Sequence, residues 1–256
     1  MEHVSETLEA LADAGVARAA LKQHSCLRGI RGVPMSEVAR IGDAVWRDDP
    51  PRLPDDADEL DHLFGAAWED GLVAIGLLAA CWPDDPTNGF DQALDWASRV
   101  DDGISADALG WFVLGPAAVV TGQVPELGAR LRQHPRDAVR RCGVMAAMAW
   151  TPAPLEGAAA APLRAKLGQT RVRMVDAAHG ELLASYLLPT LSDGAPAVRK
   201  AQRRVLRAWA KDDPQGVVAF GEQAGGALPK LLRAEVQRAR RRVDRSGAAA
   251  PGDDQP

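Results

Sequence analysis

Residues 193–229 read DGAPAVRKAQRRVLRAWAKDDPQGVVAFGEQAGGALP, and their pattern decides the fold. Two helix-forming segments, 196–211 and 214–224, are separated by Asp213-Pro214 and followed by Pro229. Proline interrupts a helix because it has no backbone N–H and because its ring clashes with the preceding turn. The stretch therefore predicts two antiparallel helices joined by a short turn.

Breaks of the same kind recur along the chain, at Pro83-Asp84-Asp85-Pro86, Gly122, Pro135, Pro152 to Pro154 and Asp193-Gly194-Ala195-Pro196. Between the breaks Ala and Leu are abundant and β-branched runs are scarce, which favours helices over strands. Helix pairs then recur about every 40 residues, the period of HEAT and armadillo repeats. Because one pair cannot bury its apolar stripe alone, we predict an all-α, HEAT-like or armadillo-type superhelix whose concave face carries the function.

Individual helices can be placed between these breaks. Ser36 precedes apolar residues at helical spacing from Val38 to Trp46. The acidic stretch 55–61 suits the start of a second helix, and a third is predicted over 69–82. Further helices are predicted at 89–99, 104–120, 125–133, 136–149, 157–167, 177–190, 196–211, 214–224 and 228–245.

The net charge of −5 conceals an uneven distribution. Residues 1–125 contain 8 basic and 22 acidic side chains, a net charge of −14, whereas residues 126–256 contain 22 basic and 13 acidic side chains, a net charge of +9. A basic half suggests a nucleic acid or another anionic partner. Solvated helix faces are the alternative explanation.

Several chain-wide features narrow the class of protein. Residues 1–245 are predicted to form a single domain, and residues 246–256, which lack periodicity, a disordered tail. Cys26, Cys81 and Cys142 form no CxxC pair, as expected of reduced thiols in a cytosolic core. We find no targeting segment and no apolar run near the roughly 18 residues that span a bilayer. A cytoplasmic protein with no membrane contact is expected.

Common catalytic motifs are absent from the sequence. It contains no GxSxG elbow, no HExxH helix and no GxGxxG turn after a strand. Residues 221–230 lack the Gly-Lys-Ser/Thr ending of a P-loop. His62 lies in an acidic stretch that we interpret as a helix start rather than a metal site. We expect neither a metal nor a cofactor.

Five segments carry a resemblance to a known family: 32–37 (GVPMSE), Trp68-Glu69 with the helix that follows, 104–115 (ISADALGWFVLG), 139–144 (VRRCGV) and 198–211 (VRKAQRRVLRAWAK). In this order they resemble the repeats of AlkD-type DNA alkylation-repair proteins, over about residues 30–245. The resemblance implies a HEAT-like repeat DNA glycosylase that removes alkylated bases.

By this resemblance Asp107 falls on the catalytic carboxylate of the family. An alkylated purine is cationic and already a good leaving group, so the reaction needs help at the sugar, which develops oxocarbenium character. A fixed anion stabilises that charge and orients the attacking water. The alternative is that Asp107 caps the helix predicted to start near Ser105.

The resemblance also places Arg141 on an arginine that faces DNA, where it would hold a phosphate. Further arginine and lysine side chains would extend the same positive surface into a concave basic groove; they are Arg140, Lys200, Arg203, Arg204 and Arg207, the last four on one helical face at three- and four-residue spacing. A solvated helix face is the competing explanation for any one of them.

Two positions depart from the family pattern. The tryptophans that bracket the damaged nucleotide in the family fall on Gly103 and Arg204. Trp111, one turn after Asp107, or Trp96 on the preceding helix is a candidate for a replacement aromatic wall, and burial in the core is the alternative for both.

Three functions are therefore kept. The first is a monomeric DNA repair hydrolase that binds alkylated or distorted double-stranded DNA and cleaves the N-glycosidic bond of a cationic purine. The second is a non-catalytic protein that binds damaged or branched DNA. The third is a helical scaffold for a protein partner, to which the acidic first half is better suited.

Overall fold

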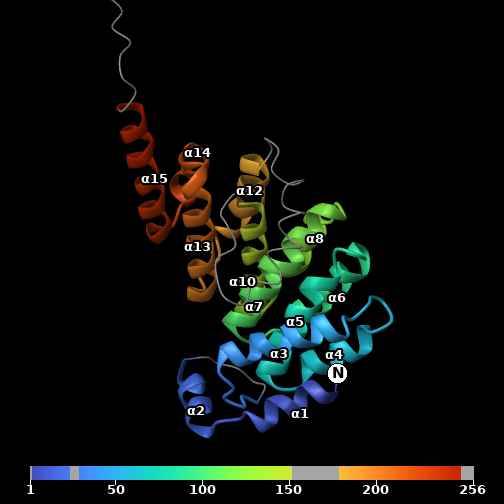
Figure 1. The fold of residues 1–256 in the computed structure, drawn as a ribbon. Coiled ribbons are helices and arrows are strands. Elements are labelled where there is room, and N and C mark those ends of the chain that lie inside the picture. The colour runs from blue at the N-terminus through green and yellow to red at the C-terminus, as the bar shows by residue number, and fades with distance from the viewer. Residues whose placement is uncertain (1, 24–28, 152–178, 249–256) are drawn as a thin grey trace, which may run out of the picture.

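The computed structural model describes residues 2–23, 29–151 and 179–248, and every regular element within these ranges is a helix (Figure 1). The predicted all-α class is confirmed. The elements up to residue 109 are α1 (Glu2–Ala10), α2 (Ala14–Gln23), α3 (Met35–Asp48), α4 (Ala57–Gly65), α5 (Trp68–Cys81), α6 (Pro86–Arg99) and α7 (Gly103–Leu109). They are followed by η1 (Gly110–Leu114), α8 (Gly115–Val120), α9 (Val124–Leu131), α10 (Asp137–Ala146), η2 (Ala147–Trp150), α12 (His179–Leu187), η4 (Leu188–Thr190), α13 (Pro196–Asp212), α14 (Pro214–Ala224), η5 (Gly225–Ala227) and α15 (Lys230–Ala248).

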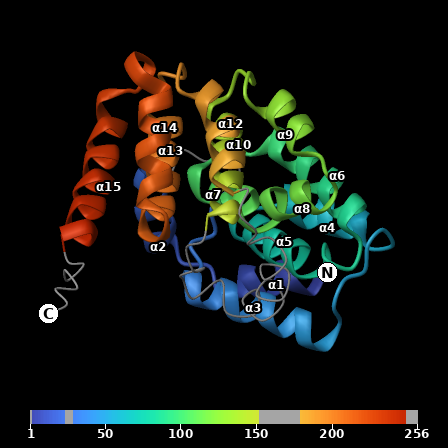
Figure 2. The ribbon, with the colours of Figure 1, turned by 90° about the horizontal axis from the view of Figure 1, so that it is seen from above.

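The helices stack in two rows (Figures 1 and 2). In the first row α3, α5, α7, α10, α13 and α15 contact one another in chain order. The second row holds α4, α6, α9, α12 and α14; α4, α6, α9 and α14 each pack on an element of the first row, and α12 packs on η2 and α14. Pairs of helices that contact only their neighbours are the mark of helical repeats. The predicted repeat architecture is therefore confirmed, and its first row holds the residues discussed below.

One continuous apolar core joins the repeats. It extends from Val4 and Leu8 in α1 to Ala239 in α15, and its largest members, among them Trp82 and Trp209, are fully buried. Because neighbouring pairs share this core, the position of one helix in the first row depends on the next.

The motif Trp68-Glu69 at the start of α5 has a structural role. The buried Glu69 carboxylate accepts hydrogen bonds from the backbone N–H groups of Arg31, Gly32 and Val33, at 3.1, 2.8 and 3.2 Å. Gly32 has a φ of 84°, in the left-handed region that favours glycine. These contacts fix the chain segment that leads into α3, so this motif belongs to the scaffold.

A π-helical turn, η1, joins α7 to α8, and its two flanking glycines pack directly on α10. A Cβ on Gly110 would lie 2.3 Å from the carbonyl oxygen of Cys142, and a Cβ on Gly115 would lie 2.1 Å from that of Ala146. Gly110 and Gly115 are five residues apart, which is about 1.4 turns of a regular α-helix and would point them in different directions. In a π turn, with hydrogen bonds from residue i to i+5, the two glycines lie nearer to one face. The π turn thus lets both glycines face α10 and sets α7 close against it.

Several predicted boundaries change. The helices α1 and α2 were not predicted, because their apolar residues are few; α1 is held mainly by the buried pair Val4 and Leu8. The helix predicted over 104–120 is divided into α7, η1 and α8. The final helix continues to Ala248, so residues 246–248, which were predicted to belong to the tail, are helical. The predicted helix 157–167 and residues 249–256 lie outside the described residues.

The expectation that no apolar run approaches a membrane span is corrected. Residues 103–120 form an 18-residue helical stretch with a mean hydropathy of 1.5, sufficient in length and composition to cross a bilayer. In the structure 61% of this stretch is buried, and it packs between α5, α6 and α10. Its apolar character follows from its place at the centre of the core.

Candidate active site and nucleic-acid interface

Asp107 lies inside α7 and does not cap it. The N-cap of α7 is Asp102, whose carboxylate accepts hydrogen bonds from the backbone N–H groups of Ile104 and Ser105 at 2.8 and 2.9 Å. Asp107 is five residues further along, with its side chain 14% exposed. The interpretation of Asp107 as a helix cap is therefore wrong.

Arg141 on α10 grips the Asp107 carboxylate with two hydrogen bonds. Its Nε donates to Oδ1 and its Nη2 to Oδ2, both at 2.7 Å, and its side chain is 17% exposed. Hydrogen bonding to Asp107 raises the pKa of the Arg141 guanidinium, although burial acts in the opposite direction. A bidentate, largely buried pair of this kind fixes the orientation of the carboxylate.

Arg204 on α13 reaches the same carboxylate from the outside. Its Nη1 donates to Oδ2 of Asp107 at 2.8 Å, and its guanidinium carbon lies 5.4 Å from the centroid of the Trp111 ring. The side chain of Arg204 is 50% exposed. Asp107, Trp111, Arg141 and Arg204 thus form one cluster, which we call the Asp107 cluster, where α7, η1, α10 and α13 meet.

Guanidinium groups occupy the neighbourhood of both positions where the family pattern has tryptophans. A Cβ on Gly103 would lie 3.3 Å from Cζ of Arg141, so the Arg141 head fills the space beside this glycine. At the second position the residue itself is Arg204. With one carboxylate between two arginines, the Asp107 cluster carries a formal charge of +1.

The two candidate aromatic walls have different fates. Trp111 belongs to the Asp107 cluster, is 8% exposed and stacks on Phe112 with ring centroids 5.2 Å apart. Trp96 is fully buried, stacks on Phe64 at 4.4 Å and donates from Nε1 to Asp61 at 2.8 Å. The expectation that Trp96 could line the site is corrected, because no part of its side chain is exposed.

Arg203 and Arg207 are joined to α15 by a buried carboxylate that was not predicted. Glu235, 3% exposed, accepts hydrogen bonds from Nε of Arg203 at 2.5 Å, Nε of Arg207 at 2.9 Å and Nη1 of Arg238 at 2.7 Å. Burial alone would raise the pKa of Glu235, but the hydrogen bonds from Arg203 and Arg238 outweigh it and hold the pKa below its ordinary value. We call these residues the Glu235 cluster. Its signal in the sequence was an isolated carboxylate within a strongly basic helix.

The other two predicted DNA-binding residues differ from each other. Arg140 donates to Asp193 at 2.6 Å and to the carbonyl oxygens of His134 and Pro135 at 2.7 and 2.9 Å, so it joins the loop before α10 to the loop before α13. Lys200 is exposed and, in the part of the chain that the structure describes, makes no ion pair.

A family model described as DNA alkylation repair enzyme matches residues 4–237. The chain belongs to this DNA alkylation repair family. The match confirms the resemblance drawn from the five segments, and it assigns the protein a role in DNA alkylation repair with DNA as its partner. Neither a curated protein nor a solved structure matches the chain significantly.

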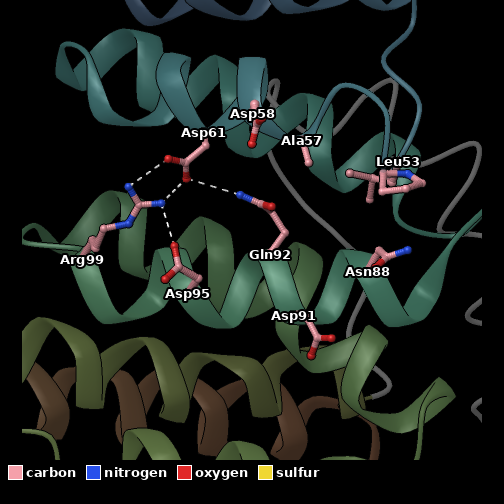
Figure 3. A pocket seen from close by; sticks show the side chains of 10 residues that line it. Leu53, Ala57, Asp58, Asp61, Asn88, Asp91, Gln92, Asp95 and Arg99 are labelled. Carbon is pink, nitrogen blue, oxygen red and sulfur yellow. Dashed lines mark hydrogen bonds and ion pairs between the residues drawn. The ribbon is translucent and has the colours of Figure 1, made fainter.

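A cavity of about 580 Å³ between α4 and α6 contains none of the residues predicted for the DNA alkylation repair site (Figure 3). Its polar lining includes Asp58, Asp61, Asp91, Asp95 and Arg99, and the Arg99 guanidinium pairs with both Asp61 and Asp95. Burial acts to raise the pKa of Asp61, but the contact with Arg99 holds it below its ordinary value. An acidic lining of this kind repels phosphate, so DNA is expected on another face of this family member.

Among the residues that the structure describes, the remaining titratable groups offer no second reactive centre. Cys81 and Cys142 are free, buried thiols, and burial raises the pKa of the Cys142 thiol, which keeps it protonated and unreactive. Within residues 2–23, 29–151 and 179–248, no group of three His, Cys, Asp or Glu side chains is placed to hold a metal ion. Cys26 lies outside the described residues.

Proposed function

We propose that the protein binds alkylated double-stranded DNA and hydrolyses the N-glycosidic bond of a cationic alkylated purine. The observation that carries this proposal is the bidentate hold of Arg141 on Asp107 in a member of the DNA alkylation repair family. A carboxylate held by two hydrogen bonds cannot turn away when the substrate arrives. It supplies the stationary negative charge that the reaction needs.

The chemistry assigns one role to Asp107. As the bond to the cationic base breaks, the sugar gains positive charge, and a preorganised anion stabilises that transition state more than the ground state. The same carboxylate orients a water molecule toward the anomeric carbon. The base leaves as a neutral molecule, so no general acid is required. Arg141 acts as a positioning residue, because it holds the carboxylate.

DNA would lie against the basic faces of α13 and α15. Exposed cationic side chains on these two helices are Lys200, Arg204, Arg207, Lys211, Lys230, Arg233, Arg238, Arg240, Arg241, Arg242 and Arg245. Contacts of lysine and arginine with phosphates provide affinity without sequence specificity. This affinity falls as the salt concentration rises, because counterions compete for the phosphates. We expect recognition from the backbone side along a concave basic groove, without the deep pocket of a base-flipping enzyme.

The test uses a duplex that contains a single 7-methylguanine. The wild-type protein is expected to release the base and leave an alkali-labile abasic site, and Asp107→Asn is expected to lower the single-turnover rate by about 10²–10³-fold, as for removal of one preorganised electrostatic group. Asp91→Asn, which removes the same charge from an exposed position on α6, is the matched control and should retain the wild-type rate. Release at the wild-type rate by Asp107→Asn would contradict the role of this carboxylate.

The second candidate is a protein that binds damaged or branched DNA without cutting the glycosidic bond. The observation that favours it is the contact of Arg204 with Asp107, which gives the cluster a positive formal charge and replaces an aromatic wall. Salt-dependent binding of the duplex by the wild-type protein, with no base release over many hours, would select this candidate. Binding of no duplex at any salt concentration would instead favour the protein scaffold.

A further inference from the structure

We propose that Arg204, held over Trp111, is a phosphodiester-binding site, and that a DNA phosphate displaces Asp107 as the partner of its guanidinium. The inference rests on the proposed DNA binding and concerns the regulation of the same site. It makes the availability of the Asp107 carboxylate depend on whether Arg204 has found a phosphate.

The two arginines hold Asp107 very unequally. Arg141 makes two hydrogen bonds and is 17% exposed, whereas Arg204 makes one and is 50% exposed. A half-exposed pair with a single hydrogen bond contributes little to stability, because solvent screens it. Of the five N–H donors of a guanidinium, Arg204 gives only one to Asp107, so a planar edge remains for a second ligand. The contact of Arg204 is therefore the one that can exchange.

Trp111 provides a fixed platform for that exchange. Its ring is 8% exposed and stacks on Phe112, and it belongs to the π turn that is pressed against α10. The Arg204 guanidinium over this ring gains a cation–π attraction that does not depend on its hydrogen-bond partner. Arginine also matches the geometry of phosphate with two parallel donors. The guanidinium can thus turn its edge from a carboxylate to a phosphate without leaving the ring.

The exchange alters what the carboxylate can do. Oδ2 of Asp107 accepts from both Arg141 and Arg204, which occupies both of its lone pairs. When Arg204 turns to a phosphate, one lone pair of Oδ2 is freed for water, and the −1 charge of the bound phosphodiester brings the formal charge of the Asp107 cluster from +1 to zero. A developing oxocarbenium ion is repelled less by the neutral arrangement. The carboxylate would therefore act on a nucleotide within a strand and not on a free alkylated nucleoside, which brings no phosphodiester.

Binding measurements test the exchange without any need for catalysis. The dissociation constant of a plain duplex is measured across a salt series for the wild type, Asp107→Asn, Arg204→Gln and the double variant. If a phosphate must take Arg204 from Asp107, then Asp107→Asn tightens binding by about 1.5- to five-fold, since no ion pair has to break. Arg204→Gln weakens binding, lowers the salt slope by about 0.9 and abolishes the gain from Asp107→Asn in the double variant.

Glu222→Gln is the matched control for the loss of a negative charge. Glu222 is an exposed carboxylate on α14 that pairs with Arg240 at 2.7 Å, and its removal should tighten binding to the same extent with or without Arg204. Should Asp107→Asn fail to fold, the test rests on Arg204→Gln alone. A dependence of its log affinity on log salt concentration equal to that of the wild type would overturn the proposed phosphate site at Arg204.

The outcomes separate the two proposals. If the affinity of the wild type for the duplex does not change with salt concentration, both the proposed DNA binding and the proposed exchange are wrong. Salt-dependent binding by the wild type, combined with an unchanged affinity of Asp107→Asn or a gain that persists in the double variant, overturns the exchange alone. Salt-dependent binding with a gain confined to proteins that retain Arg204 supports both.

Discussion

At the scale of single residues, the most consequential feature is that arginine side chains occupy both places beside Asp107 where the family pattern has tryptophans. Arg141 fills the space next to Gly103, and Arg204 lies over Trp111. Because Arg141 makes the stronger contact, substitution of the two should give different results. Arg141→Gln is expected to release the carboxylate from its position, whereas Arg204→Gln leaves that position intact.

Glu235 offers a prediction about stability that is independent of DNA. Glu235→Gln removes a buried negative charge while three arginines remain around its position, so we expect it to lower the free energy of unfolding by about 2–3 kcal/mol. Urea denaturation measures this change. Glu222→Gln, which breaks the exposed pair with Arg240, is the control and should change stability by about 0.5 kcal/mol or less. Equal effects of the two substitutions would contradict the structural role of Glu235.

At the scale of elements, the glycines that flank the π turn hold α7 against α10. Gly110→Ala and Gly115→Ala each place a methyl group within 2.3 Å of a backbone carbonyl oxygen of α10. We expect each to cost about 1–3 kcal/mol, measured by thermal or urea denaturation, and to loosen the alignment of Asp107 with Arg141.

A glycine in α5 serves as the control for this prediction. A Cβ on Gly76 meets no atom within 4 Å, so Gly76→Ala should stabilise the protein by about 0.5–1 kcal/mol through helix propensity alone. Destabilisation by Gly76→Ala that matches that of Gly110→Ala would show that the close packing on α10 is not the cause.

Comparison of the predicted and observed elements shows which features depend on local sequence and which depend on distant contacts. Proline and glycine breaks are local signals, so they located α3 to α6, α9, α10 and α12 to α15 to within a few residues, but α7, η1 and α8 were predicted as one helix. The π turn could not be predicted, because it follows from the contact of Gly110 and Gly115 with α10, about 30 residues later. The resemblance brought Asp107, Arg141 and Arg204 into one site. The role of Glu235 was not predicted, because its partners Arg203 and Arg207 lie on another helix, 32 and 28 residues away.

At the scale of the whole molecule, carboxylates held by arginines connect successive repeats and make stability depend on pH. Burial acts to raise the pKa values of Asp193 and Glu235, but hydrogen bonds from Arg140 and from Arg203 and Arg238 hold them below their ordinary values of 3.8 and 4.5. A lowered pKa in the folded protein contributes stability that is complete above the ordinary value and is lost as pH falls through the lowered one.

Thermal unfolding between pH 6 and pH 3 measures this dependence. We expect a nearly constant melting temperature above about pH 5 and a decline below it, worth about 1–3 kcal/mol for these two groups. The decline should be smaller in Glu235→Gln, which has one such carboxylate fewer. A melting temperature that rises as pH falls toward 3 would contradict the assignment.

The division of charge along the chain affects how the molecule orients in an electric field. The acidic and the basic halves lie at opposite ends of the stacked helices (Figure 1), so the molecule has a permanent electric dipole along its stacking direction. For the proposed binding of a duplex, we expect this dipole to experience a torque that turns α13 and α15 toward the phosphates and the acidic end away. Such a torque would orient the protein during diffusion, before any side chain touches DNA.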